Sequence, residues 1–479
     1  MKRKDWEAVI GLEIHAELNT RSKLFSADRN HFGDEPNTNI SEVSVALPGT
    51  LPVLNREAVR KAVQFGLAIQ GDVQLWSRFD RKSYFYPDSP RNYQITQLEF
   101  PIVKGGRLIT FVDGDEKIFD INRVQLEDDA GMLKHFARFA GVDFNRAGVP
   151  MIEIVSEPCM RSAHEAVAYA RGIRAILDYL DASDCNMEEG SIRFDVNVSV
   201  RKIGETDLRT RSEIKNMNSF AQLEVAIDHE INRHIGIYES ERSVDQETFR
   251  WDPEAGTTVL MRTKEDAEDY RYFPDPDLLP LVLTQKEVDA EKEHLPELPL
   301  DRERRFCQEY GLAEQMSYCL ISDKKLADYF EKALEKCKTA KNVANWIVVE
   351  FAGRLKDKGT PIWKSGIDPH DVGELVFMIE QDKITGKIAK SVADDMVAQP
   401  GVSPQMIVEA NPAYQTFSDV EELKKIVHDV VEQNEETVQA VRAGKDRSFA
   451  FLVGQVMRVT KGSAPPKLVN KLLREEIGQ

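Results

Sequence analysis

Residues 9–18 read VIGLEIHAEL, and apolar and polar side chains alternate strictly along this stretch. The apolar residues of one parity are Ile10, Leu12, Ile14, Ala16 and Leu18. Glu13, His15 and Glu17 occupy the other parity. Because successive side chains of a strand point to opposite faces, the alternation predicts a strand with one buried face. Its polar face has two interpretations: an ordinary face in solvent, or one wall of a metal site.

The chain has 479 residues, which is too long for one hydrophobic core and suggests about three domains. Its 42% hydrophobic and 30% charged residues are typical of a soluble globular protein. No apolar run reaches the roughly 18 residues of a membrane helix. The N-terminus MKRKDWEAVIG has no signal-peptide core, so we expect no membrane association. Five cysteines without a CxxC pair favour reduced thiols in the cytoplasm over disulfides or a zinc site.

The net charge of -18 argues against a protein that coats nucleic acid without specificity, because phosphate contacts need a local excess of cations. The C-terminal end differs from the rest. From Val441 onward there are eight cations and three acids, a net +5 that leaves -23 on the remainder. A basic end on an acidic body fits a protein that contacts nucleic acid at one place. A solvated helix face remains the alternative.

Strand patterns dominate up to about residue 290, which predicts an α+β domain with a mainly antiparallel sheet. Within it, FPIVKGGRLITFV at 100–112 predicts a hairpin that turns at Gly105–Gly106. Ser162 and Glu165 have the spacing of a capping box and predict the start of a helix.

After the proline-rich linker LPELPL the pattern becomes helical, and ANPAYQTFSD at 410–419 marks a second break. The predicted division is therefore an α+β domain over 1–294, an all-helical domain over 295–409 and a small helical tail domain over 410–479.

Further segments repeat the polar face of the opening strand. SIRFDVNVSV, residues 191–200, places Asp195 opposite an apolar face, and MIEIVSE places Glu153 in the same way. RVQLEDDAG adds Glu127, Asp128 and Asp129 at a predicted strand end. Carboxylates with one histidine suit Mg²⁺ or Mn²⁺ better than structural zinc. Acids on a solvated sheet face are the equally open alternative.

The segment FDRKSYFYPDSPRNYQITQ, residues 79–97, mixes cations with aromatic rings around two prolines. Such a segment can hold a phosphate or stack on a base, or it can be a rigid structural loop. The sequence has no P-loop, no G-x-G-x-x-G and no G-x-S-x-G, so neither P-loop ATP binding nor a nucleophile elbow is expected.

Long motifs in order along the chain carry a family resemblance. They include VIGLEIHAEL, RKSYFYPDSPRNYQIT, LEDDAG, DFNRAGVPMIEIVSEP, NMEEGSIRFDVNVSVR, EIKNMNSF, WDPEAGTT and DYRYFPDPDLLPL, followed by SFAFLVGQVMRVTKGSAPPKLVNKLL near the end. Together they closely resemble GatB, the family of B subunits of tRNA-dependent amidotransferases. The run from EINRH to WDPEAG is too short for the inserted domain of the archaeal relative GatE, so the bacterial type is expected.

The resemblance implies a "cradle" catalytic domain with kinase and transamidase activity, followed by the helical and tail domains. It implies a ligase that uses ATP and Mg²⁺ to phosphorylate the side chain of Glu on tRNA-Gln or Asp on tRNA-Asn. Ammonia from a GatA-like amidase subunit then gives the amide, and a GatC-like small subunit completes a cytoplasmic heterotrimer. Which misacylated tRNA is used depends on the synthetases of the host.

Carried over by position, the resemblance implies roles for named residues. His15, Asp128 and Glu153 would bind one metal ion, with Glu127 as the alternative to Asp128 because Asp replaces a common Glu there. Glu13 and Asp195 would bind a second ion near the nucleotide. The implied catalytic set is Glu153, Asp195, Lys82 and Tyr84, and the implied tRNA contacts are Arg458 and Lys461.

Two further expectations complete the interpretation. Glu17 is expected to be an ordinary solvated residue. A tRNA-binding scaffold without catalysis is the competing hypothesis, favoured by Asp128 alone, and a free-standing metal hydrolase is disfavoured because no activated nucleophile is visible.

Overall fold

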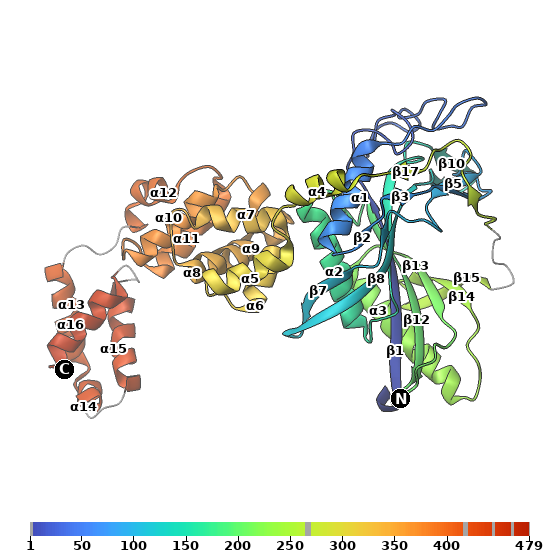
Figure 1. Cartoon of the computed structure of the whole chain (residues 1–479). Helices are drawn as coiled ribbons and strands as arrows, with labels where there is room; N and C mark the ends of the chain where they lie inside the picture. Colours follow the sequence, from blue (N-terminus) through green and yellow to red (C-terminus); the bar gives the residue numbers. More distant parts are fainter. Residues whose placement is uncertain (1–2, 264–269, 415–419, 443–445, 461–463, 479) are drawn as a thin grey trace. The chain divides into compact units, whose positions relative to one another are not determined.

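The computed structural model describes residues 3–263, 270–414, 420–442, 446–460 and 464–478. The chain divides into two compact units, Met1–Arg302 and Glu303–Gln479 (Figure 1). The first is α+β and the second is helical, which confirms the predicted fold class. The predicted division at 294/295 and 409/410 stays a prediction. Among the described residues, no helix is both long and apolar enough to cross a membrane.

A ten-stranded sheet is the centre of the first unit, with the order β15-β14-β13-β12-β1-β11-β8-β6-β2 and β7 paired to β8. Its pairs are antiparallel except β13 with β14. The strands are β1 (Trp6–Glu17), β2 (Asp72–Val73), β6 (Val103–Lys104), β7 (Arg107–Val112), β8 (Asp115–Asp128), β11 (Pro150–Ser156), β12 (Ile192–Lys202), β13 (Ser212–Met217), β14 (Glu247–Asp252) and β15 (Thr257–Thr263).

Smaller strands flank this sheet. A two-stranded sheet joins β9 (Met132–His135) to β10 (Ala140–Asp143). A three-stranded sheet joins β16 (Phe273–Pro274), β4 (Asp80–Ser83) and β5 (Tyr93–Thr96), and β17 (Leu281–Val282) pairs with β3 (Trp76–Ser77).

The apolar face of the sheet is covered by α1 (Arg56–Ala68), α2 (Ala163–Tyr179) and α3 (Phe220–Glu239). Ile10, Leu12 and Ile14 of β1 are at most 1% exposed in this core, as the alternation predicted. Helix α2 begins after Ser162, whose hydroxyl accepts from the Glu165 amide at 3.1 Å. Helix α4 (Gln285–Glu293) follows α3 in the chain.

The predicted hairpin at Gly105–Gly106 is wrong. Strands β6 and β7 both pair with β8 rather than with each other. Gly105 and Gly106, at φ 62° and 120°, lie between the segment that pairs as β6 and the segment that pairs as β7. The true hairpin joins β7 to β8 through Asp113 and Gly114, both at positive φ, which is typical of a tight two-residue turn.

The second unit is helical. Its helices are α5 (Pro299–Glu309, which starts just before the unit), α6 (Glu314–Ile321), α7 (Lys324–Ala333), α8 (Ala340–Asn345), α9 (Ala352–Leu355), α10 (Pro369–Glu380), α11 (Gly386–Ala398), α12 (Pro404–Ala410), α13 (Val420–Gln433), α14 (Glu435–Arg442), α15 (Asp446–Val459) and α16 (Pro466–Ile477). Between α8 and α9, Trp346–Phe351 forms a π-helix. One hydrophobic cluster runs from Phe306 to Ile407, and a separate one runs from Leu423 to Ile477.

Candidate active site

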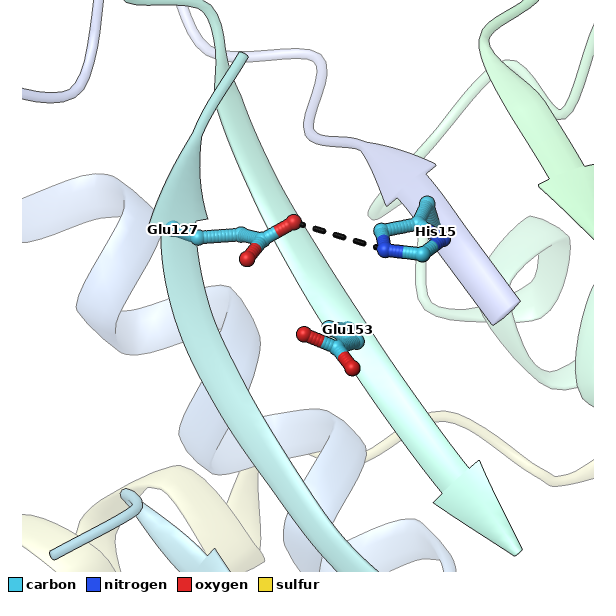
Figure 2. Close-up of side chains that lie close together, drawn as sticks. All are labelled: His15, Glu127 and Glu153. Carbon is cyan, nitrogen blue, oxygen red and sulfur yellow. Dashed lines mark ion pairs between the residues drawn. The ribbon is translucent and has the colours of Figure 1, made fainter. Parts of the chain in front are cut away.

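The polar face of the sheet gathers side chains from three neighbouring central strands. His15 of β1 lies opposite Glu153 of β11, which in turn lies opposite Gln125 of β8. Residues directly opposite in an antiparallel pair point to the same face. Glu127 lies two residues beyond Gln125 and therefore shares this face. Figure 2 shows His15, Glu127 and Glu153 pointing toward one another from these strands.

His15, Glu127 and Glu153 form a compact group of donors. Each offers one ligand atom, and these atoms all lie within 4.8 Å of one another. The His15 Nε2 atom lies 3.5 Å from Glu127 Oε1. Glu153 Oε2 accepts from Gln125 Nε2 at 2.7 Å, and Glu127 Oε2 accepts from the Thr96 hydroxyl at 3.3 Å. The carboxylates are therefore held in place by neighbouring side chains and aimed at the histidine.

Burial shapes the charge of this group. It raises the pKa values of Glu127 and Glu153, and the charge of Glu127 raises the pKa of Glu153 further. Burial lowers the pKa of His15. Two buried carboxylates beside an imidazole are costly when both are ionised, unless a cation neutralises them. One nitrogen and two carboxylate groups at this spacing are donors that fit a divalent cation such as Mg²⁺ or Mn²⁺.

Asp128 does not join this group. Its carboxylate pairs with Arg91 and accepts from the amide of Ile95 at 2.9 Å. Glu127, the alternative, is the acid that faces His15. Asp128 also borders the cavity, but at the opposite strand parity to Glu127 it is turned toward Arg91 and Ile95 rather than toward His15. The structure thus gives Glu127 the position that the sequence analysis first assigned to Asp128.

Glu13 and Asp195 lie opposite each other on β1 and β12. Asp195 accepts from Lys215 Nζ at 3.0 Å and from the Asn216 amide at 2.8 Å. Burial would raise the pKa of Asp195, but Lys215 lowers it. Each carboxylate oxygen of Asp195 therefore accepts one hydrogen bond. The second ion at Glu13 and Asp195 stays a prediction.

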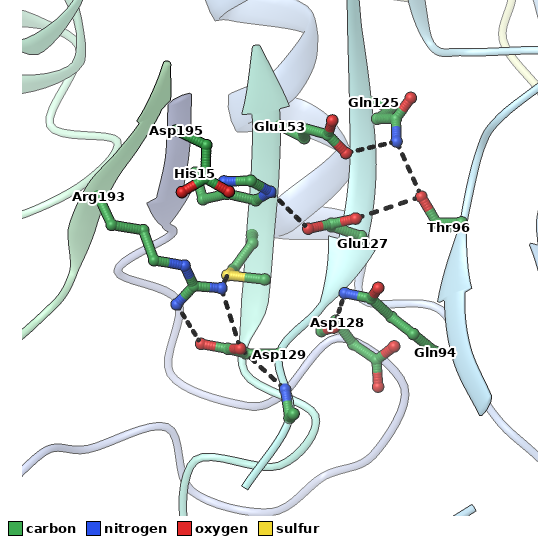
Figure 3. Close-up of polar contacts among 12 residues, drawn as sticks. His15, Gln94, Thr96, Gln125, Glu127, Asp128, Asp129, Glu153, Arg193 and Asp195 are labelled. Carbon is green, nitrogen blue, oxygen red and sulfur yellow. Dashed lines mark hydrogen bonds and ion pairs between the residues drawn. The ribbon is translucent and has the colours of Figure 1, made fainter. Parts of the chain in front are cut away.

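Arg193 was not assigned to the site by the sequence analysis, and Asp129 was named there only among the acids at a predicted strand end. Arg193 contacts Asp129 through two nitrogens at 3.1 and 3.2 Å (Figure 3). Burial would raise the pKa of Asp129, but Arg193 and Arg146 lower it to about 2. Arg193 lies two residues before Asp195 on β12, so the period-2 pattern places both side chains on the same face. Its partner could not be found that way, because Asp129 lies on a distant segment.

The expectation that Glu17 is a solvated residue is wrong. Its side chain is half-buried beside Asp129. Burial and the charge of Asp129 raise the pKa of Glu17 to about 8. Glu17 therefore belongs to the buried charge network next to the donor group.

The donor group of His15, Glu127 and Glu153 lines a cavity of about 630 Å³ in the first unit. All the predicted residues of this domain reach it: Glu13, His15, Lys82, Tyr84, Asp128, Glu153 and Asp195. Burial alone would lower the pKa of Lys82, but the carboxylate of Glu127 raises it. The ammonium of Lys82 also lies 4.8 Å from the centre of the Tyr270 ring. The cavity thus combines anionic donors with cations, and its volume suits a small-molecule ligand.

The predicted tRNA contacts lie in the second unit. Arg458 is exposed in the last turn of α15. Lys461 lies outside the described residues.

Comparisons with known proteins agree along the whole chain. A family model described as the GatB/GatE catalytic domain matches residues 8–289, and a model described as the GatB domain matches residues 328–477. The B subunit of the aspartyl/glutamyl-tRNA(Asn/Gln) amidotransferase of Protochlamydia amoebophila is 60% identical over 479 residues, covering 99% of this chain and 97% of that protein. The proteins of the same name from Chlamydia pneumoniae and Chlamydia abortus are 55% and 54% identical, and each alignment covers 99% of this chain.

Proposed function

Since the chain belongs to the GatB family, the B subunits of aspartyl/glutamyl-tRNA amidotransferases, we propose that it carries the kinase and transamidase site of such an enzyme. Its substrates are ATP and tRNA misacylated with Glu (tRNA-Gln) or Asp (tRNA-Asn). Its products are the corresponding amides, ADP and phosphate. We propose that it acts in the cytoplasm.

The chemistry has two steps. A side-chain carboxylate oxygen attacks the γ-phosphorus of ATP, ADP leaves, and the carboxylate becomes an acyl phosphate. Ammonia then attacks the carbonyl carbon, the C–O bond breaks, phosphate leaves, and the nitrogen releases a proton. Phosphoryl transfer depends chiefly on positioning and on neutralising charge, so no nucleophilic side chain is required.

The observation that carries the proposal is the donor group of His15, Glu127 and Glu153 inside a cavity that also holds cations. We assign Mg²⁺ to these residues. When bound, the cation supplies charge neutralisation for the transferring phosphoryl group and its leaving group. Gln125 and Thr96 orient the two carboxylates.

The chain's own cations complete the site. Lys82 and Lys215 line the cavity, and their positive charge stabilises phosphate oxygens as negative charge develops. Asp195 fixes Lys215 by the 3.0 Å contact, so we assign Asp195 to orienting this ammonium. Burial would lower the pKa of Lys215, but Asp195 and Glu213 raise it and keep the group charged.

Ammonia must reach the acyl phosphate as neutral NH₃, which requires a protected route. We propose that a GatA-like amidase subunit supplies it and that a GatC-like small subunit completes the heterotrimer. Lys82 and Tyr84 line the cavity, and we assign to them the contact with the incoming ammonia. A tRNA-binding scaffold without catalysis is the competing hypothesis, and ADP formation on misacylated tRNA separates the two.

The test uses the complex reconstituted with both partner subunits. Glu153→Gln should abolish ADP formation and amide formation on misacylated tRNA, while glutamine hydrolysis by the amidase persists. Glu116→Gln is the matched control, because Glu116 is exposed near the far end of the neighbouring strand β8. Undiminished Gln-tRNA or Asn-tRNA formation by the Glu153 variant would refute the site. Running both misacylated tRNAs in parallel identifies the substrate.

A further inference from the structure

The β9–β10 hairpin carries an aromatic pair that the proposed chemistry does not use. Phe136 and Phe139, at its tip, are 54% and 66% exposed. Their rings stack with centroids 4.7 Å apart and planes 26° apart. The Phe136 amide donates to the Phe139 carbonyl at 2.8 Å and closes the loop. Exposing two large stacked rings is unfavourable in a free protein, which points to a binding surface.

Hydrogen bonds fix the hairpin at its base, so the position of the tip relative to the domain is defined. Asn37 donates to the Val142 carbonyl at 3.0 Å and accepts from the Phe144 amide at 2.7 Å. Arg146 donates to the carbonyls of Ala130 and Gly131 at 3.0 and 2.8 Å. The two strands therefore leave the body of the domain from an anchored base.

The same base forms part of the cavity wall. Asp129, Ala130 and Arg146 line the cavity on both sides of the hairpin in sequence. Phe136 follows Ala130 by six residues. At about 3.4 Å per extended residue, the tip lies no more than roughly 20 Å from the cavity wall. A ligand at the tip and a group reacting in the cavity can thus belong to one substrate molecule.

The charge of the hairpin favours a polyanion. Lys134 and Arg138 are exposed, and no acidic residue occurs between Met132 and Val142, in a chain of net charge -18. Flat exposed aromatic rings beside cations are the surface that unpaired nucleic-acid bases use, because any base can stack on a ring while its phosphate meets the cation.

We propose that Phe136, Phe139, Lys134 and Arg138 form a stacking platform for the unpaired 3′ end of the tRNA and hold it beside the cavity. This inference rests on the proposed function, since it takes the substrate to be aminoacyl-tRNA. The platform binds bases by stacking and backbone by charge, so it does not depend on base identity.

The experiment compares binding of two RNAs to the assembled complex. One is the intact tRNA, and the other is the same tRNA without its unpaired 3′ nucleotides. The wild type should bind intact tRNA at least tenfold more tightly than truncated tRNA, as expected for stacking of one or two bases. The double variant Phe136→Ser/Phe139→Ser should lose that preference and bind truncated tRNA as the wild type does. Both rings are exposed, so the fold should survive.

Two further variants sharpen the result. Ile118→Ser is the matched control, because Ile118 is 53% exposed on the β7–β8 hairpin, near the opposite end of β8 from the cavity. It should keep the full preference. Arg138→Gln should weaken binding and reduce the slope of log affinity against log salt by about one.

Several outcomes would overturn the platform. A double variant that keeps the preference for intact tRNA refutes it, and so does one that loses affinity equally for both RNAs. If the double variant loses the amidase subunit from the complex but keeps its preference for intact tRNA, the tip is a protein interface instead. A wild-type complex that binds no tRNA contradicts the proposed function itself, which separates that failure from failure of the platform.

Discussion

Glu127 and Asp128 are adjacent in the chain but have different partners. Burial raises the pKa of Glu127, while the charges of Lys82 and Arg193 act to lower it. Asp128 is 1% exposed and is paired with a guanidinium. One acid is therefore available to a cation, whereas the other stabilises the fold.

We expect Glu127→Gln to raise the Mg²⁺ concentration for half-maximal ADP formation by more than about a hundredfold, because loss of an outer partner alone usually costs about 10- to 100-fold. Its metal-free thermal stability should change little, because the substitution removes the repulsion from Glu153 together with the attraction of Lys82 and Arg193. Mg²⁺ should also stabilise the wild type but not this variant against heat.

The neighbouring substitution serves as the comparison. Asp128→Asn should lower thermal stability by a few kcal/mol, because it leaves the largely buried Arg91 without its anionic partner. Its response to Mg²⁺ should stay close to that of the wild type. If Asp128→Asn instead abolishes the Mg²⁺ response while Glu127→Gln preserves it, the metal assignment must be reversed.

Glu303 makes the helical unit sensitive to pH. The residue is 4% exposed, and its Oε1 atom has no hydrogen-bond partner among the described residues. Burial, with the charge of Glu314, raises the pKa of Glu303 to about 7. A carboxyl whose pKa is raised by folding contributes stability that is fully present below its unfolded pKa of about 4.3. That contribution is lost as the pH rises through 7.

Glu303→Gln should remove this loss, because the amide stays neutral at every pH. The stability of the variant relative to the wild type should increase from pH 5 to pH 8 by at most about 3 kcal/mol. Thermal unfolding across that range measures the change. Glu309→Gln, at an exposed position of the same helix α5, should show no such trend. If the stability difference between Glu303→Gln and the wild type does not change with pH, the raised pKa of Glu303 is contradicted.

Strand parity determines how much of the site the sequence could predict. It placed Glu13, His15, Glu153 and Asp195 on one face, and the same rule applied to Val124 and Leu126 would have selected Glu127. Assignment by position in a family motif led to Asp128 instead. The network of Glu17 with Asp129 could not be predicted, because it depends on segments that approach each other only in the folded chain.

At the scale of elements, helix α10 packs against α7 through a glycine. A Cβ atom on Gly373 would lie 2.2 Å from the Ala333 carbonyl oxygen, which is backbone and cannot move aside cheaply. Gly353 in α9 has open space around the same position. Both residues are helical, so alanine is intrinsically favoured at both by about 1 kcal/mol.

Gly353→Ala should therefore stabilise the helical unit slightly. Gly373→Ala should destabilise it by about 1–3 kcal/mol, as overpacking usually does. Equilibrium unfolding in urea compares the two substitutions directly. Equal effects would mean that α10 and α7 can separate without cost.

The edge of the sheet shows why element boundaries were harder to predict than element types. The strands around Gly105–Gly106 were identified as strands, but their partner was not. A two-glycine turn is the usual signal for a hairpin. Here β8 is long enough, at 14 residues, to pair with both segments in succession, and this information lies outside the quoted stretch.

At the scale of the whole molecule, the C-terminal helices have a core of their own. Leu423, Val427, Leu452, Val456 and Leu473 belong to a cluster distinct from that of residues 306–407. Ending the chain after residue 414 should therefore leave the cavity and the first helical core intact.

We expect this truncation to raise KM for misacylated tRNA about tenfold, because it removes the basic end that includes Arg458. The value of kcat should change little, since the chemistry lies in the first unit. Steady-state kinetics at low salt measures both. A fall in kcat with unchanged KM would assign the tail to catalysis rather than to tRNA binding.

The place of β1 in the sheet has a consequence for synthesis on the ribosome. This strand is made first, yet its partners are residues 150–156 and 192–202. At about 5–20 residues per second, roughly ten to forty seconds pass before β12 is complete. During that time an alternating strand with an apolar face has no neighbour, and non-local pairing is slow. The nascent chain should therefore depend on chaperones until about residue 202 has emerged.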